Sequence, residues 1–128
     1  MNKEIVLGGS VLIALSIALG AFGAHGLKDI VDEHGIDVFN TGARYQMYSG
    51  LACLAVGLSA DKFGFSLKWF YRLQMLGIII FAFFLYGAAF QSVYPQAKFF
   101  GAIVPIGGVL MIVSWCVFIF QLMKTKKK

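Results

Sequence analysis

The stretch 5–24 limits the possible folds of this chain more than any other part, because it contains no charged residue. Only Ser10 and Ser16 interrupt its apolar and small side chains. A helix of about 20 such residues matches the hydrocarbon thickness of a bilayer, roughly 30 Å. A cleavable signal peptide is the rival interpretation, since Lys3 precedes the run, but a signal core is usually only ~7–15 residues long. We therefore expect a retained membrane-spanning helix.

The composition places the whole chain in the same class. Hydrophobic residues make up 59% of the sequence and charged residues 13%, whereas soluble domains are about 45–50% apolar. The fold class that we predict is all-α, an integral membrane four-helix bundle in a single domain over 1–128. The expected transmembrane helices cover 5–24, 41–60, 70–90 and 99–122.

The segment after the first span is unusually acidic, with four of the six acidic residues of the chain. Leu27, Ile30 and Val31 share helical spacing on the side opposite the acids. This pattern predicts a short amphipathic helix lying on the membrane surface between helices one and two, ended by Gly35. The acids are Asp29, Asp32, Glu33 and Asp37, and His34 among them is expected to be solvated.

Lysine and arginine set the expected orientation. The N-terminus, the connection 61–72 and the C-terminal tail carry most of the 11 lysines and arginines, whereas the other side holds Lys28, Arg44 and Lys98. The positive-inside rule then places both termini in the cytoplasm. The net charge of +5 is interpreted as this topology signal and not as a nucleic-acid surface, because the basic residues form no groove-sized patch.

Small residues indicate where helices approach closely. They recur at four-residue spacing in the first span, at Ser16, Gly20 and Ala24, and such stripes are typical of contacts between membrane helices. In the fourth span, Pro105 predicts a bend because proline removes a backbone hydrogen bond. The expected helix-packing residues are Gly20, Gly23, Ala24, Ser49, Gly57, Pro105, Gly107 and Gly108.

The interiors of the expected spans exclude several kinds of chemistry. They contain no Asp, Glu or Lys, and Arg44 is expected near a helix start. A proton-driven pump is disfavoured, since coupling usually depends on ionisable groups inside the membrane. His25, His34 and the acids show no catalytic or metal-ligand spacing. We therefore predict no enzyme, no catalytic residue, no metal site and no cofactor.

The polar residues that remain are expected to form a collar at the outer membrane interface. It comprises His25, Arg44, Tyr45, Tyr48 and Gln91. One interpretation is that they only anchor and cap helices. The other is a ligand site in which Arg44 and His25 hold an anionic headgroup between the tyrosines. Both interpretations place His25 near Tyr45 and Tyr48, with a hydrogen-bond partner there, on Gln91 or on the loop backbone.

Three motifs together resemble a known family. They are Gly-Ala-Phe-Gly-Ala-His at 20–25, Thr-Gly with Tyr-Gln-Met-Tyr within 41–48, and Gly-Ala-Ile-Val-Pro-Ile-Gly-Gly at 101–108 ahead of Trp115. This combination is similar to the YgdD/YwdK-like family of small four-helix bacterial membrane proteins of unknown function. The resemblance implies the bacterial cytoplasmic (inner) membrane, crossed several times. The chain departs from the family pattern at Ser49, Phe84 and Val104, which replace polar positions and count against a histidine pair or a polar track.

Two functional hypotheses follow. The first is a non-enzymatic protein that binds a membrane lipid, or another membrane protein, through the bundle and the outer collar. The second is a subunit of an oligomeric channel or transporter, in which the small-residue faces pack between copies in a homo-oligomer. Neither involves nucleic acid.

Overall fold

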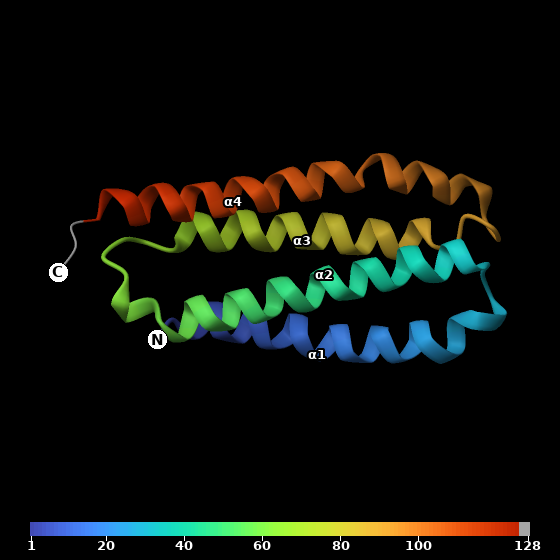
Figure 1. Ribbon diagram of the computed structural model, residues 1–128, viewed down its shortest axis with the longest axis horizontal. Coiled ribbons are helices and arrows are strands. Elements are labelled where there is room, and N and C mark those ends of the chain that lie inside the picture. Colours follow the sequence, from blue (N-terminus) through green and yellow to red (C-terminus); the bar gives the residue numbers. More distant parts are fainter. Residues whose placement is uncertain (126–128) are drawn as a thin grey trace.

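The computed structural model describes residues 1–125, and the basic tail 126–128 lies outside the described residues. Four long helices run up and down along one axis (Figure 1): α1 Lys3–His25, α2 Glu33–Leu58, α3 Lys68–Ala88 and α4 Val104–Lys124. Within 1–125 there is no strand. The predicted all-α four-helix architecture is therefore confirmed. Because the number of helices is even, α4 ends at the end of the bundle where α1 begins, which we call the terminal end.

The prediction of an amphipathic surface helix that reaches Gly35 is wrong. The connection contains only a four-residue 3-10 helix, Gly26–Asp29. α2 begins already at Glu33, because the Asp32 side chain caps it by accepting a hydrogen bond from the Gly35 amide over 2.9 Å. Gly35 does not end a helix. It lies in the first turn of α2, where a Cβ would collide with the carbonyl oxygen of Ala89.

The predicted bend at Pro105 is also absent, because Pro105 does not lie in the interior of a helix. The stretch Pro95–Ala102 forms a separate 3-10 helix, and α4 starts only at Val104. Pro105 therefore stands in the first turn of α4. At that position its missing N–H removes no intrahelical hydrogen bond, and its fixed φ favours the start of a helix.

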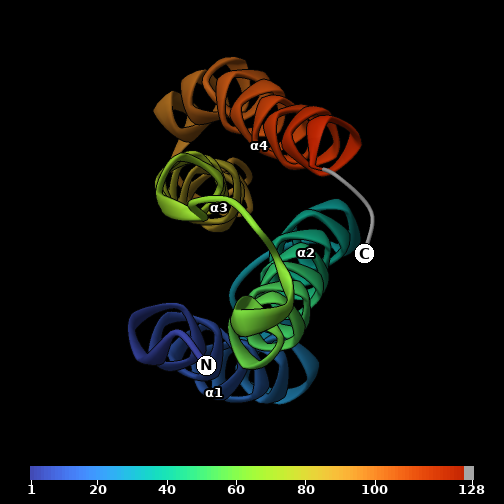
Figure 2. The same ribbon diagram turned by 90° about the vertical axis from the view of Figure 1, so that its left-hand side faces the viewer.

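The helices form two hairpins, α1 with α2 and α3 with α4, joined by contacts between α2 and α3. Figure 2 shows α2 and α3 in the middle, with α1 and α4 on opposite sides. One core cluster packs Phe39, Ile78 and Tyr86, and a second, near the terminal end, packs Ile5 and Phe70. The outer faces of α1 and α4 are apolar and exposed, with Ile17 at 62% and Ile112 at 65%. Such faces suit contact with lipid.

Three segments are long and apolar enough to cross a membrane: Lys3–Asp29, Lys68–Ala88 and Pro95–Lys124. α2 is also long, at 26 residues, but it is not among them. Polar side chains such as Asn40, Arg44 and Gln46 interrupt its sequence. α2 lies between α1 and α3 (Figure 2). There the Gln46 side chain forms hydrogen bonds with Leu12 of α1 and Tyr86 of α3.

Glycines mark the closest contact inside the first hairpin. A Cβ on Gly9 would lie 2.8 Å from the carbonyl oxygen of Gly50, and one on Gly50 would lie 2.9 Å from that of Gly9. Gly57 is similarly close to Val6, with 2.9 Å to its amide nitrogen, and Gly23 faces Asn40 at 2.6 Å. Larger side chains at these positions would push α1 and α2 apart.

The predicted contact at Gly20 is missing, since a Cβ there would meet no atom within 4 Å, and Ala24 is exposed. The buried residues of α1 are Ile5, Gly9, Leu12, Ser16 and Gly23. They follow a mixed spacing of three and four. A strict spacing of four turns about 40° away from a neighbour at each step, because a helix has 3.6 residues per turn.

In the second hairpin, α3 and α4 meet at two glycines. A Cβ on Gly77 would lie 2.9 Å from the carbonyl oxygen of Gly107, and a Cβ on Gly107 would collide with the backbone of Phe81. Gly108 faces the Phe81 ring at an ordinary contact distance of 3.6 Å. The stretch 107–108 thus lies at the helix contact that the sequence indicated, and Gly77 is its partner.

Candidate functional site

A network of polar side chains occupies the middle of the bundle. All four helices contribute to it, and every member is buried. Its members are Ser16, Gln46, Ser49, Gln74, Tyr86 and Ser114. The sequence indicates them only as polar interruptions in apolar spans. Of the six, only Ser49 is among the predicted site residues, as a helix-packing residue.

One branch of the network joins α1, α2 and α3 through Gln46. The Gln46 amide Nε2 donates to the carbonyl oxygen of Leu12 over 3.0 Å, and its Oε1 accepts from the Tyr86 hydroxyl over 2.6 Å. Beside it, the Ser16 hydroxyl donates to the carbonyl oxygen of Ala43 over 2.9 Å. These bonds fix the depth of α1 relative to α2.

The second branch joins α2, α3 and α4 through Gln74. Its Nε2 donates to the Ser49 hydroxyl oxygen over 2.8 Å. The single hydroxyl proton of Ser114 is shared between Gln74 Oε1, at 2.5 Å, and the carbonyl oxygen of Met111, at 2.7 Å. Among the described residues, the only buried side-chain polar atom without a partner is Oε1 of Gln121, which lies outside this network. A network of buried polar side chains that are each hydrogen-bonded holds helices together in lipid.

The five residues of the predicted outer collar do not form one cluster, although the Tyr45 and Tyr48 rings contact each other. His25 is exposed at the end of α1, and Gln91 is exposed in the turn after α3. Tyr45 lies about 18 Å along α2 from Glu33, at 1.5 Å per residue. Gly23 of α1 packs beside Asn40 of α2. Because the two helices are antiparallel, His25 lies closer than Gly23 to the start of α2, whereas both tyrosines lie on the other side of Asn40. The predicted contact between His25 and these tyrosines is therefore absent, and the early start of α2 explains why.

Arg44 lies much deeper than its predicted place at an interface. Its neighbour Ala43 accepts a hydrogen bond from Ser16, and Gln46 donates one to Leu12. Leu12 and Ser16 flank the middle of the apolar stretch 5–24. The Arg44 backbone is therefore level with the centre of that stretch, roughly 15 Å from either end. Its side chain is exposed on the surface of the bundle.

Arg44 belongs to a line of polar side chains on one face of α2. Asp37, Thr41, Arg44 and Tyr48 are spaced by four, three and four residues. The Thr41 hydroxyl donates to the Asp37 carbonyl oxygen over 2.8 Å, and Nη2 of Arg44 donates to Thr41 Oγ1 over 3.2 Å. We call these four residues the α2 stripe. It runs from the end of the bundle opposite the terminal end to half-depth.

A groove of about 490 Å³ continues from the stripe towards α4. Ser49 and Gln74 contribute its polar part. Its walls are aromatic and apolar, and the Tyr45 ring packs on Tyr48 at 5.4 Å and on Phe81 at 5.2 Å between centroids. The remaining lining residues are Ala52, Gly108, Met111, Ile112 and Trp115. We call it the mid-bundle groove.

This arrangement can hold a charged group. Within residues 1–125, no group of three or more His, Cys, Asp or Glu side chains could hold a metal ion. The buried hydroxyls of the network bond to amides and backbone carbonyls, so none is paired with a basic side chain. What the site offers is a guanidinium, two exposed tyrosines and an apolar groove.

Comparison with known proteins identifies relatives over nearly the whole chain. The family model described as "Protein of unknown function (DUF423)" matches residues 19–108. A UPF0382 membrane protein of Staphylococcus aureus is 35% identical over 122 residues, which is 95% of this chain and 97% of the relative. Similar proteins of Staphylococcus epidermidis and Staphylococcus saprophyticus are both 34% identical, again over 95% of this chain. They cover 97% and 98% of the respective relatives.

No solved structure matches this chain. The relatives are named as membrane proteins, in agreement with the long apolar helices, and their names assign no enzymatic activity. The narrower YgdD/YwdK-like name stays a prediction. The match over residues 19–108 establishes that this helical membrane protein belongs to the DUF423 family of proteins of unknown function.

Proposed function

We propose that the protein binds a membrane phospholipid without catalysing a reaction, with the lipid phosphate on Arg44 and an acyl chain in the mid-bundle groove. The observation that carries this proposal is the depth of Arg44. Arg44 is level with the middle of the apolar stretch 5–24 of α1, and an exposed arginine at such a depth in a membrane is rare and is usually functional. In a membrane, the exposed face of α2 that carries Arg44 is in contact with lipid.

The charge of Arg44 needs a partner that the described residues do not supply. An arginine at the centre of a spanning helix costs about 2.5–3.5 kcal/mol on insertion scales. The hydrogen bond to Thr41 directs the guanidinium about 4.5 Å towards the headgroups but leaves its charge uncompensated. No carboxylate of residues 1–125 lies within 4 Å of it. A phosphate drawn inward would neutralise it with a bidentate pair of hydrogen bonds.

The mid-bundle groove suits the apolar part of the same molecule. Tyr48 is 56% exposed and Ile112 65% exposed, so both borders of the groove face the bilayer. The walls carry aromatic rings and the flexible side chain of Met111, which adapts to irregular apolar shapes. A lipid whose phosphate lies at Arg44 can therefore place one chain beside Tyr45 and Trp115.

We place the protein in the bacterial cytoplasmic membrane with both termini in the cytoplasm. The terminal end carries Lys3, Lys62, Lys68, Arg72 and Lys124, which supports this orientation by the positive-inside rule. The acidic start of α2 then faces outward. In this orientation the α2 stripe opens to the outer leaflet, and the bound lipid comes from that leaflet.

A second candidate function is a subunit of an oligomeric channel or transporter. It is favoured by the same position of Arg44, since in an oligomer this face of α2 could line water between copies. The exposed apolar faces of α1 and α4 would then contact lipid or a second copy. Ion flux into liposomes that depends on Arg44, together with a stable oligomer, would favour this function over lipid binding by a monomer.

Native mass spectrometry of the full chain, released from nanodiscs of defined phospholipids, tests lipid binding. We expect retained phospholipid on the wild type and on Lys98→Gln, which removes a cation that lies beside the Phe99 ring, away from the stripe. Arg44→Gln should retain fewer phospholipid molecules than the wild type, and Arg44→Lys should hold the lipid at this site weakly because the charge remains but the bidentate pair is lost. Equal retention by Arg44→Gln and Lys98→Gln would contradict the proposal.

A further inference from the structure

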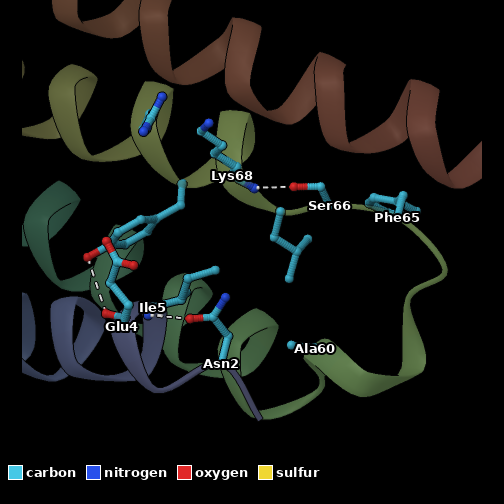
Figure 3. A pocket seen from close by; sticks show the side chains of 10 residues that line it. Asn2, Glu4, Ile5, Ala60, Phe65, Ser66 and Lys68 are labelled. Atoms are coloured by element: carbon cyan, nitrogen blue, oxygen red, sulfur yellow. Dashed lines mark hydrogen bonds between the residues drawn. The ribbon is translucent and has the colours of Figure 1, made fainter.

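A second cavity lies at the terminal end of the bundle, far from Arg44. Figure 3 shows it between the start of α1, the connection after α2 and the start of α3. Its volume is about 450 Å³. Lys3 begins α1 and Lys68 begins α3, so the cavity stands where the spans begin, at headgroup depth. We call it the terminal-end cavity.

The cavity is lined by charges of both signs. Lys68 and Arg72 come from consecutive turns of one face of α3, and Glu4 comes from the first turn of α1. In Figure 3, Glu4 and Lys68 lie on opposite sides of the cavity. The only ion pair among the described residues joins the Met1 amino group to Asp61. The two cations and the carboxylate are therefore not neutralised by one another.

Local contacts hold these walls in place. The Tyr71 hydroxyl crosses the gap from α3 and donates to the backbone carbonyl oxygen of Glu4 over 3.3 Å. It fits there because residue 8 is glycine, and a Cβ on Gly8 would collide with the Tyr71 hydroxyl. The Arg72 guanidinium lies 5.4 Å from the centre of the Trp69 ring. Two buried side chains, Ile5 and Leu67, complete an apolar part of the lining.

We infer that the terminal-end cavity binds the headgroup of a zwitterionic phospholipid, with its phosphate at Lys68 and Arg72 and its ammonium at Glu4. The two cations suit a phosphate, because charge-assisted hydrogen bonds to phosphate oxygens are strong. A headgroup without an ammonium would leave the Glu4 carboxylate unpaired next to an anion, which opposes binding. A headgroup with both charges can pair its phosphate with Lys68 and Arg72 and its ammonium with Glu4. This site is independent of the lipid site proposed at Arg44.

The test measures binding of two short-chain lipids to the full chain in detergent by isothermal titration calorimetry. The probes are dihexanoyl phosphatidylethanolamine and dihexanoyl phosphatidylglycerol. All binding measurements use the Arg44→Gln background, so that the other proposed site cannot contribute. We expect the ethanolamine lipid to bind at least about tenfold more tightly, a difference of about 1.4 kcal/mol. Equal affinities, or preference for the glycerol lipid, would overturn the inference.

Variants test separately whether the cations on α3 bind the phosphate and whether Glu4 binds the ammonium. Lys68→Gln combined with Arg72→Gln should weaken binding of the ethanolamine lipid about tenfold or more. Lys62→Gln, a charge change in the same region but outside the cavity lining, is the matched control. Glu4→Gln should abolish the preference between the two lipids. Unchanged binding in the double variant, or an unchanged preference in Glu4→Gln, would overturn the inference. Lys68→Arg with Arg72→Lys should retain binding, which separates lost charge from misfolding.

A soluble probe identifies the source of the phosphate. Glycerophosphoethanolamine carries the same headgroup without acyl chains. If a lipid is the ligand, this probe should bind much more weakly than the short-chain lipid, because it lacks the chains that contact the apolar part of the lining. Equal binding of the two would show a soluble phosphate compound as the ligand and would overturn the assignment to a lipid.

Discussion

The Tyr86 hydroxyl of α3 lies 2.6 Å from Oε1 of Gln46 on α2, and it donates a hydrogen bond to that oxygen. Gln46 in turn donates to the backbone of Leu12 on α1. One glutamine therefore connects three helices and both hairpins. Since lipid offers no hydrogen-bonding alternative, this connection fixes the relative depth of the helices and so the depth of Arg44.

Tyr86→Phe should lower stability by about 1–2 kcal/mol, because Oε1 of Gln46 loses its donor in a buried place. Tyr94→Phe is the control, since Tyr94 is 63% exposed. Thermal unfolding in one detergent, followed by circular dichroism, measures both. Equal melting temperatures for the two variants would show that the bond contributes nothing measurable.

Gly50→Ala and Gly20→Ala form a matched pair in the first hairpin. The new methyl at position 50 would lie 2.8 Å from Ile13 Cγ1 and 2.9 Å from the Gly9 carbonyl oxygen. Overpacking of this kind typically costs about 1–3 kcal/mol. At position 20 there is open space, so alanine should be neutral or stabilise by up to about 1 kcal/mol through helix propensity. The same unfolding assay measures both, and a larger loss at position 20 would contradict the packing described for α1.

Single-cysteine labelling tests the proposed orientation. In a background without Cys53 and Cys116, Glu33→Cys should react with a membrane-impermeant maleimide on intact cells. Lys62→Cys should react only after the membrane is opened, because it lies at the terminal end with most of the basic residues. The reverse pattern would place the termini outside.

Much of the fold could be predicted because it depends on local patterns. Uncharged stretches of bilayer length predict α1, α3 and α4, and the charges of the connections suggest the orientation of the bundle. α2 begins eight residues before the predicted start at 41, because Asp32 and Glu33 are the cap and first turn of α2 and not part of a surface helix. The contact at Gly20 was also wrong, because small residues indicate only which faces could pack, and the crossing of two helices selects among them.

The candidate site was less predictable for the same reason. Arg44, Tyr45 and Tyr48 were identified from the sequence, but their depth depends on the hydrogen bonds from Ser16 and Gln46 to neighbouring backbones. Gln74 and Ser114 meet only because α3 and α4 pack at one particular register. No spacing within either helix reveals this meeting. The predicted contact of His25 with the tyrosines requires a connection that extends to residue 40, whereas residues 33–40 form the first two turns of α2.

The central claim, that Arg44 binds a lipid phosphate inside the membrane, can be measured as a distance. The chain has two arginines, Arg44 and Arg72. In an Arg72→Lys variant labelled with ¹⁵N-arginine and reconstituted in phospholipid, all guanidinium ¹⁵N signals come from Arg44. Solid-state NMR should show dephasing of its Nη signals by lipid ³¹P, as expected for a bidentate arginine–phosphate pair in direct contact. Nη signals without any ³¹P dephasing would contradict the proposed function.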